Sequence, residues 1–75
     1  MDFNQRVAIG IEFMQYVTYN NIKLPAKMRE RKRMFIKWYV ERNRRKRYAD
    51  IIKELSNEIL YVKEITLERL VFNEK

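Results

Sequence analysis

The chain has 75 residues and a formal net charge of +7, which fits one domain near the lower size limit for an independent hydrophobic core. It contains no cysteine and no histidine, which excludes disulfides, zinc fingers and histidine-dependent catalysis. Gly10 and Pro25 are its only glycine and proline. So few helix breakers in a chain rich in Glu, Lys, Arg, Ile and Leu predict an all-α fold.

Residues 1–22 carry two competing patterns. Apolar residues alternate as in a strand, at Val7, Ile9, Ile11 and Phe13. They also recur at helical spacing, at Phe3, Val7, Ile11 and Met14. We predict a helix that begins at Phe3 with Asp2 as its N-cap, because a lone strand would lack a partner. Asn20 and Asn21 should end it, since Asn tolerates left-handed backbone geometry, and residues 22–24 should be extended before the proline.

A second helix is predicted from Pro25 to about Arg42, because proline suits the first turn of a helix. Its apolar residues are Met28, Met34, Phe35, Ile36, Trp38, Tyr39 and Val40. The aromatic residues among them are expected in the core rather than as stacking platforms for bases. The cations Arg29, Arg33 and Lys37 fall mostly on another flank. Residues 43–46 contain no apolar residue and are predicted to be a connector, so that 26–46 forms a basic helix with its connector.

The third helix, from Tyr48 to about Leu60, has the clearest pattern. Its apolar residues follow helical spacing at Tyr48, Ile51, Ile52, Leu55 and Ile59, and its polar residues lie opposite. A fourth helix should begin between Lys63 and Thr66. Its buried stripe is predicted to be Leu67, Leu70 and Val71. The whole chain is therefore expected to be a single helical domain, a small bundle of about four helices.

Positive charge is concentrated in the middle of the chain. Between Lys27 and Arg47 there are eleven basic residues and only two acidic ones, Glu30 and Glu41, for a net charge of +9. Such a segment can neutralise phosphates and release counterions from a nucleic acid. The acidic residues of the third helix are expected to be its solvent side rather than a metal or catalytic cluster.

The segment from Arg47 to Phe72 reads RYADIIKELSNEILYVKEITLERLVF. It resembles the helix-turn-helix of small DNA-binding proteins of bacteria, phages and mobile elements, including Mor-type transcription activators and transposase-like proteins. The matching positions are Ile51-Ile52-x-x-Leu55 in a first helix and Val62-x-x-x-Thr66-Leu67-x-Arg69-Leu70-Val71 in a second. The resemblance covers roughly the last 26 to 45 residues, from the basic helix onward, and not the N-terminal helix. It implies a C-terminal helix-turn-helix over 47–73.

Within that motif, five apolar residues are expected to converge between the two helices: Ile51, Leu55, Val62, Leu67 and Leu70. The chain departs from the family at two positions, where Ile52 replaces a small residue and Lys63 replaces a serine N-cap. We expect wider packing from the first change and a helix start delayed toward Thr66 from the second. The connector over 57–61 is longer than in the shortest version of the motif, which predicts an extra turn on the first helix.

The resemblance implies that the exposed face of the last helix consists of Lys63, Glu64, Ile65, Glu68, Arg69, Phe72 and Asn73. Arg69 would then read guanine and Lys63 would hold a phosphate, whereas Glu64 and Glu68 oppose contact with DNA. Phosphate contacts are expected from the basic helix and connector, at Arg29, Arg33, Lys37, Arg42, Arg44, Arg45, Lys46 and Arg47.

We therefore expect a non-enzymatic protein without cofactors that binds double-stranded DNA with weak sequence specificity, as a transcription regulator or recognition module of a phage or mobile element. Ile9, Phe13 and Tyr16 are compatible with a homodimer contact. No apolar run approaches the roughly 20 residues that span a bilayer, and no signal-peptide pattern opens the chain, so a cytoplasmic location is expected in a bacterium or a phage-infected cell.

Two alternatives stay open. The helix-turn-helix could be the scaffold of a protein-interaction adaptor that docks through its last helix. The basic helix could instead bind RNA or an anionic membrane, inserting Met34, Phe35, Ile36 and Trp38. DNA titration at two salt concentrations separates these functions.

Overall fold

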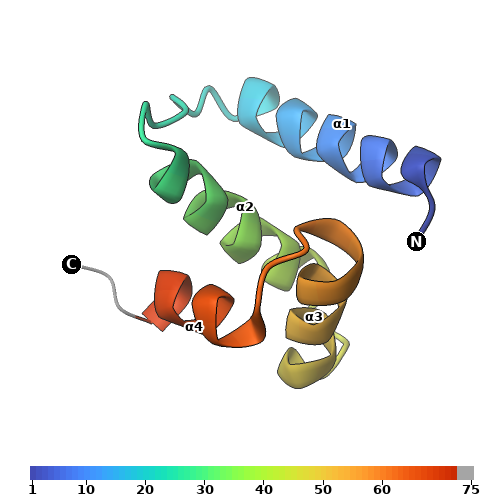
Figure 1. Ribbon diagram of the computed structural model, residues 1–75. Helices are drawn as coiled ribbons and strands as arrows, with labels where there is room; N and C mark the ends of the chain where they lie inside the picture. Colours follow the sequence, from blue (N-terminus) through green and yellow to red (C-terminus); the bar gives the residue numbers. More distant parts are fainter. Residues whose placement is uncertain (73–75) are drawn as a thin grey trace.

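The computed structural model describes residues 1–72, with Phe72 described by its backbone only. Within this range the chain forms four helices: α1 (Phe3–Tyr19), α2 (Met28–Arg42), α3 (Tyr48–Glu54), which continues as the π-helical turn η1 (Leu55–Ile59), and α4 (Glu64–Phe72) (Figure 1). Residues 1–72 contain no strand. The predicted all-α bundle of about four helices is confirmed, and the N-terminal segment is a helix and not a strand.

The two ends of α1 follow the sequence prediction. The Asp2 carboxylate accepts a hydrogen bond from the Gln5 backbone N–H (2.8 Å), and the Gln5 side chain accepts one from the Asp2 N–H (3.0 Å), which is a complete capping box. At the other end Asn21 adopts a left-handed φ of 51°. The Ile22 N–H then donates to the Val17 carbonyl (2.9 Å), so the chain leaves the helix at the predicted place.

The start of α2 differs from the prediction. The helix begins at Met28, three residues after Pro25, with Lys27 as an N-cap that makes no side-chain capping bond. The Pro25 carbonyl instead accepts a hydrogen bond from the Arg31 Nε. Proline therefore belongs to the extended link from α1, and the Arg31 side chain ties that link to the first turn of α2.

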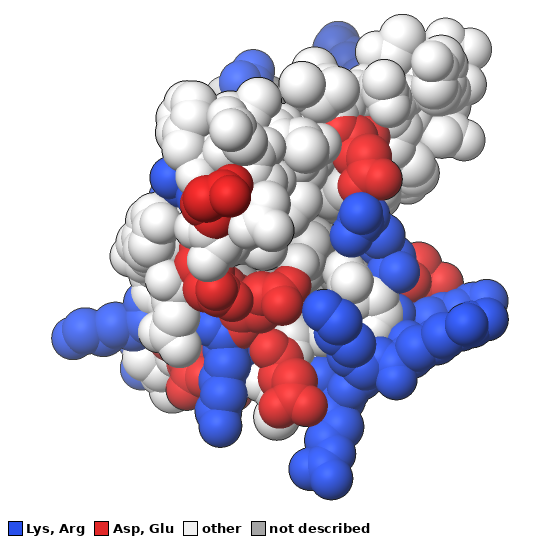
Figure 2. Space-filling model, turned by 90° about the vertical axis from the view of Figure 1, so that its right-hand side faces the viewer, with Lys and Arg blue, Asp and Glu red and all other residues white. Residues whose placement is uncertain are grey.

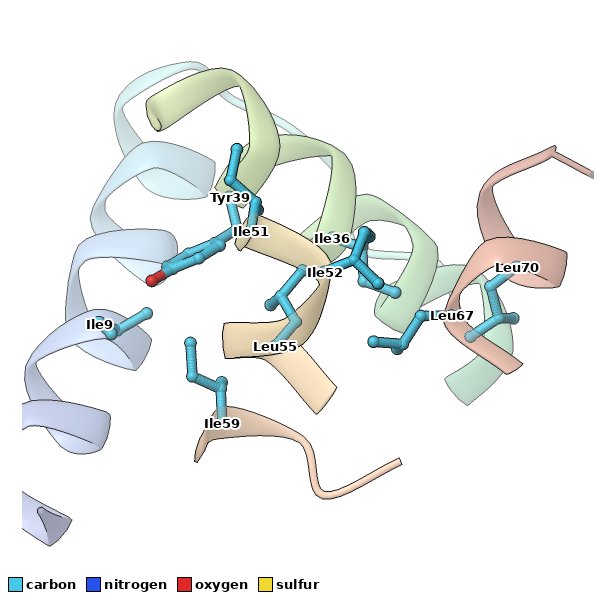
Figure 3. Close-up of a cluster of buried hydrophobic side chains, with 9 residues drawn as sticks. All are labelled: Ile9, Ile36, Tyr39, Ile51, Ile52, Leu55, Ile59, Leu67 and Leu70. Carbon is cyan, nitrogen blue, oxygen red and sulfur yellow. The ribbon is translucent and has the colours of Figure 1, made fainter. Parts of the chain in front are cut away.

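The core contains side chains from all four helices (Figure 3). Its buried members are Ile9, Ile36, Tyr39, Ile51, Ile52, Leu55, Ile59, Leu67 and Leu70. The predicted convergence of the last two helices is confirmed, with Val62 partly buried against the cluster. Ile52, for which wider packing was expected, is only 2% exposed and belongs to this core.

The last two helices meet at a tight turn. The helix after Tyr48 runs on to Ile59, which confirms the predicted extra length, and it ends with the Leu60 N–H donating to the Leu55 carbonyl five residues back (2.8 Å). The Ser56 hydroxyl donates to the Val62 carbonyl across the turn. Tyr61 has a left-handed φ of 52°. The next helix begins at Glu64, so the expected delay toward Thr66 does not occur.

α1 presents an unexpected face to the core. Ile9, Phe13 and Val17 are buried, and Phe13 packs edge-on against Phe35 and Trp38 of α2, with ring centroids 5.2 and 5.3 Å apart. Of the residues expected to form a homodimer contact, Ile9 and Phe13 are thus covered within one chain, whereas Tyr16 is 38% exposed. The four apolar residues whose spacing predicted this helix lie on the opposite side and are exposed: Phe3 (71%), Val7 (42%), Ile11 (54%) and Met14 (47%).

α2 does not separate an apolar face from a charged one as predicted. The Arg33 Nε donates to the Leu70 carbonyl of α4 (2.7 Å), and Arg29 lines a groove against the same helix. Both cations share the face of α2 that carries the fully buried Ile36. They meet the C-terminal half of α4, where free carbonyls and the helix dipole favour positive charge.

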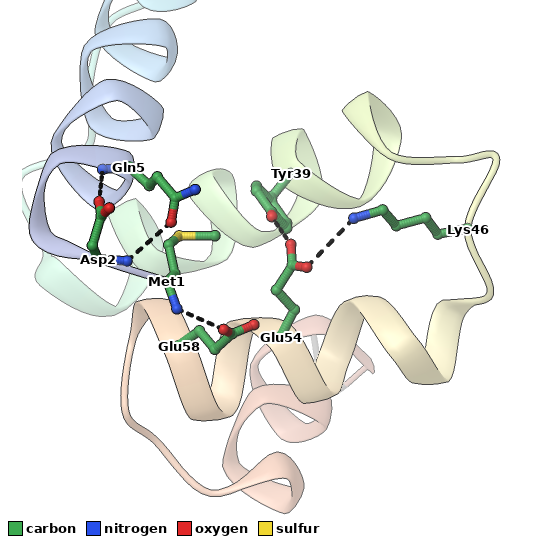
Figure 4. Close-up of polar contacts among 7 residues, drawn as sticks. All are labelled: Met1, Asp2, Gln5, Tyr39, Lys46, Glu54 and Glu58. Carbon is green, nitrogen blue, oxygen red and sulfur yellow. Dashed lines mark hydrogen bonds and ion pairs between the residues drawn. The ribbon is translucent and has the colours of Figure 1, made fainter.

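A chain of polar contacts joins α2, the connector and α3 (Figure 4). The hydroxyl of Tyr39, a residue only 2% exposed, donates to the Glu54 carboxylate. The other oxygen of Glu54 lies 3.4 Å from the Lys46 Nζ. Burial, reinforced by the hydrogen bond to Glu54, raises the pKa of Tyr39 well above its usual value of 10.0.

We expect Tyr39→Phe to lower the free energy of unfolding by about 1.5–3 kcal/mol at pH 7, because it removes a hydrogen bond to a carboxylate. The raised pKa means that the folded state disfavours tyrosinate, so this part of the stability is present below pH 10 and is lost as the pH rises further. The loss from Tyr39 should reach about 1.4 kcal/mol at pH 11 in the wild type and be absent in the variant.

Urea unfolding at pH 7 and pH 11, followed by circular dichroism, measures both effects. Tyr19→Phe is the matched control, because Tyr19 is 79% exposed and should unfold as the wild type does at both pH values. An alkaline loss of stability in Tyr39→Phe equal to that of the control would contradict the role given to Tyr39.

Candidate nucleic-acid interface

The link between α2 and α3 carries four consecutive cations, Arg44, Arg45, Lys46 and Arg47, which we call the basic connector. Its backbone is held by the Lys46 N–H, which donates to the Asn43 carbonyl (2.8 Å). All four residues are exposed. The Arg44 Nη1 lies 3.4 Å from the Glu41 Oε1, but both side chains are more than 70% exposed, so this pair is weak. Only Lys46 is linked to a partly buried group, through its 3.4 Å contact with Glu54, so the connector can offer its cations to a ligand at little cost to the core.

Two of the predicted phosphate contacts hold the fold together instead. The Arg42 Nη2 lies 2.6 Å from the Glu12 Oε2 of α1, and its guanidinium lies 5.8 Å from the centre of the Trp38 ring. Arg33 donates to the Leu70 carbonyl of α4. These side chains fasten α1 and α4 to α2, and we leave them out of the interface.

A second cationic site lies where α2 and α4 pack together. A groove of about 480 Å³ is lined by Met28, Arg29, Lys32, Thr66, Arg69 and Leu70, and we call it the α2–α4 groove. The structure thus brings Arg69 next to Arg29, two predicted site residues that are 40 positions apart. Lys32 and Thr66 were missed by sequence reasoning. The signal for Lys32 was its position four residues before Ile36, on the same helix face.

Lys37 does not join this groove. It lies on another flank of α2, in a separate depression with Glu30, Trp38 and Glu41. Lys63 is exposed just before α4, and its carbonyl accepts the N–H groups of Thr66 (3.0 Å) and Leu67 (3.2 Å). The predicted site residues therefore fall into several separate places and do not form one continuous patch.

The acidic residues of α4 face the start of α3. Glu64 and Glu68 line a small depression with Tyr48 and Lys53, on a different side of α4 from the groove that contains Arg69. Partial burial, together with the nearby Glu68 carboxylate, raises the pKa of Tyr48. Glu64 and Glu68 are both exposed, so they would repel a phosphate brought to this edge. The side chains of Phe72 and Asn73, also expected on this face, lie outside the described residues.

Figure 2 shows how charge is distributed on one side of the molecule. Basic side chains project from its lower part around a band of acidic ones, while its upper part, at the height of α1, is mostly uncharged. Within residues 1–72, no group of three or more acidic side chains is placed to hold a metal ion. No helix in that range is long and apolar enough to cross a bilayer.

No protein-family model matches this chain, and no match was found among curated proteins or solved structures. The resemblance of residues 47–72 to a helix-turn-helix therefore stays a prediction from the sequence.

Proposed function

We propose that this protein binds double-stranded DNA through its phosphates, with little preference for sequence. The observation that carries the proposal is the basic connector, in which four adjacent cations are exposed and none contributes to the core. Each cation that contacts a phosphate releases a condensed counterion, which drives association without any base contact. Such a protein would serve as a regulator or a recognition module of a phage or mobile element.

The α2–α4 groove supplies a second set of phosphate contacts in this proposal. Arg29, Lys32 and Arg69 line it together with the Thr66 hydroxyl, and a guanidinium can hold phosphate oxygens through two donors at once. Direct reading of bases is not part of the proposal. Glu64 and Glu68 lie within the first five residues of α4, the part of a recognition helix that would approach the bases.

The packing of α2 favours DNA over an anionic membrane as the ligand of the basic segment. Ile36 is fully buried, and Phe35 and Trp38 pack against Phe13 of α1. Three of the four residues expected to insert into a membrane are thus occupied within the fold. The cations of the basic connector and of the α2–α4 groove take no part in this aromatic packing.

The test is a titration of a fluorescently labelled duplex at 50 and 200 mM salt. With seven phosphate contacts, from the connector and the groove, affinity should fall by at least about a thousandfold between the two salt concentrations. Duplexes of unrelated sequence should bind within a few-fold of one another. Affinity that does not respond to salt, or strong preference for one sequence, would contradict the proposal. An RNA duplex bound far more tightly than DNA would reassign the ligand.

A further inference from the structure

The exposed apolar side of α1 has no partner within the chain. We call it the α1 face and define it by Phe3, Val7, Gly10, Ile11 and Met14. Its four large side chains are between 42% and 71% exposed. Together with Gln15, Thr18 and Tyr19, four of the five residues line a shallow depression along the helix. Neighbouring apolar side chains on a small monomer are costly to leave in water, so the α1 face is suited to a contact.

The α1 face carries no ionised side chain. The only charged residues of α1 are Arg6 and Glu12, and both are engaged elsewhere. The Arg6 Nη2 donates to the Ile59 carbonyl (3.1 Å) and its guanidinium lies 4.7 Å from the centre of the Tyr61 ring, whereas Glu12 pairs with Arg42. An acidic or basic partner would find nothing to pair with on this surface. An uncharged apolar surface of the same length complements it, and a second α1 supplies one.

Gly10 lies in the middle of the α1 face. A side chain added there would meet no atom within 4 Å, so nothing inside the chain requires glycine at this position. Glycine in a helix costs about 0.5–1 kcal/mol relative to alanine. The absence of a side chain does allow a second helix backbone to approach closely, as small residues do in packed helix pairs.

We propose that two copies of this chain form a symmetric dimer by packing their α1 faces against each other. A specific interface buries at least about 1,000 Å² in total, so the contact must extend from the α1 face to Gln15, Thr18 and Tyr19, which line the same depression. In Figure 1, α1 lies on one side of α2, and α3 and α4 lie on the other. The α1 face is the side of α1 turned away from the buried Ile9 and Phe13, and its depression shares no residue with the α2–α4 groove. Because the α1 face carries no ionised side chain, the contact does not bring like charges directly together, although each chain carries a charge of +7.

Sedimentation equilibrium tests the interface with two variants, in which the replaced side chains are equally exposed in the monomer. Ile11 on the α1 face and Ile65 on α4 are both 54% exposed, so a change to glutamate should leave the monomer folded in each case. We expect the wild type and Ile65→Glu to be dimeric at roughly 100 µM, and Ile11→Glu to be monomeric. A monomeric wild type, or dimers that survive Ile11→Glu, would overturn the proposal. A monomeric wild type that binds neutral lipid vesicles would assign the α1 face to a membrane surface instead.

A cross-link provides an independent readout, because the chain contains no cysteine. Ile11 is the midpoint of α1, so a two-fold axis through the middle of the helix pair brings the two copies of Ile11 together, whether the helices run parallel or antiparallel. Ile11→Cys should form a disulfide-linked dimer in oxidised glutathione, and Ile65→Cys should not. Equal cross-linking of both variants would indicate random collision and refute the α1 interface. Neither experiment contains DNA, so the outcome is independent of the proposed function.

Discussion

Replacing Arg44, Arg45, Lys46 and Arg47 together by glutamine should weaken binding to every DNA duplex by roughly a thousandfold near 0.1 M salt. Each lost phosphate contact removes about 0.9 from the slope of log affinity against log salt, so the slope should become shallower by about 3.6. The fold should survive, because these residues are exposed and only the Lys46 contact to Glu54 links them to a partly buried group.

The control is a second quadruple variant that removes the same number of positive charges from other parts of the surface. Lys23, Lys27, Lys37 and Lys53 are exposed and lie outside both the basic connector and the α2–α4 groove. Their joint replacement by glutamine should change the slope of log affinity against log salt by less than about 0.9, the value for one phosphate contact. If both quadruple variants lose the same affinity, binding depends on net charge alone and the connector is not a site. Far-UV circular dichroism of both variants checks that the helices are intact.

Leu67→Ala is expected to have the largest effect on stability. Leu67 of α4 is fully buried in the core. Replacing a buried leucine by alanine lowers the free energy of unfolding by about 2–5 kcal/mol. A domain of this size has a total free energy of unfolding of roughly 4–11 kcal/mol. Much of the margin would be lost, and the midpoint of thermal unfolding should fall by about 10 °C or more.

Thermal and urea unfolding, followed by circular dichroism, measure this effect. Ile65→Ala is the control, since Ile65 is a neighbour on the same helix but is 54% exposed, and its removal should cost less than about 0.5 kcal/mol. Equal stability of the two variants would mean that α4 is not packed on the core as described. Because Arg69 lies on α4, Leu67→Ala should also weaken the contribution of the α2–α4 groove to DNA binding.

The ends of helices and the pattern of the third helix could be predicted because they depend on near neighbours in the chain. Asp2 and Gln5 cap the first helix across three residues, and Asn21 ends it by its own left-handed geometry. The alternation that had suggested a strand was overruled by these local signals. The basic connector was also predictable, since a run of four cations without an apolar residue has no means of entering a core.

The groups of the candidate site could be predicted only in part. Arg33 and Arg42 have the same residue type as the exposed cations, and the sequence offers no sign that one reaches the Leu70 carbonyl and the other Glu12. These partners lie 37 and 30 positions away along the chain. Arg69 and Lys32 share a groove only because α4 packs on α2, a contact that helical periodicity does not specify.

The sequence by itself determined the helical class, the local caps and the place where positive charge accumulates, because each of these depends on residue type and short spacing. Only the tertiary structure decided which side of α1 is buried. Ile9 and Phe13 on one side and Val7 and Ile11 on the other are equally apolar, so hydrophobicity alone could not choose between them. The choice followed from the aromatic rings of α2, against which Phe13 packs, and from the contacts of Arg6 and Glu12 that hold α1 in that orientation.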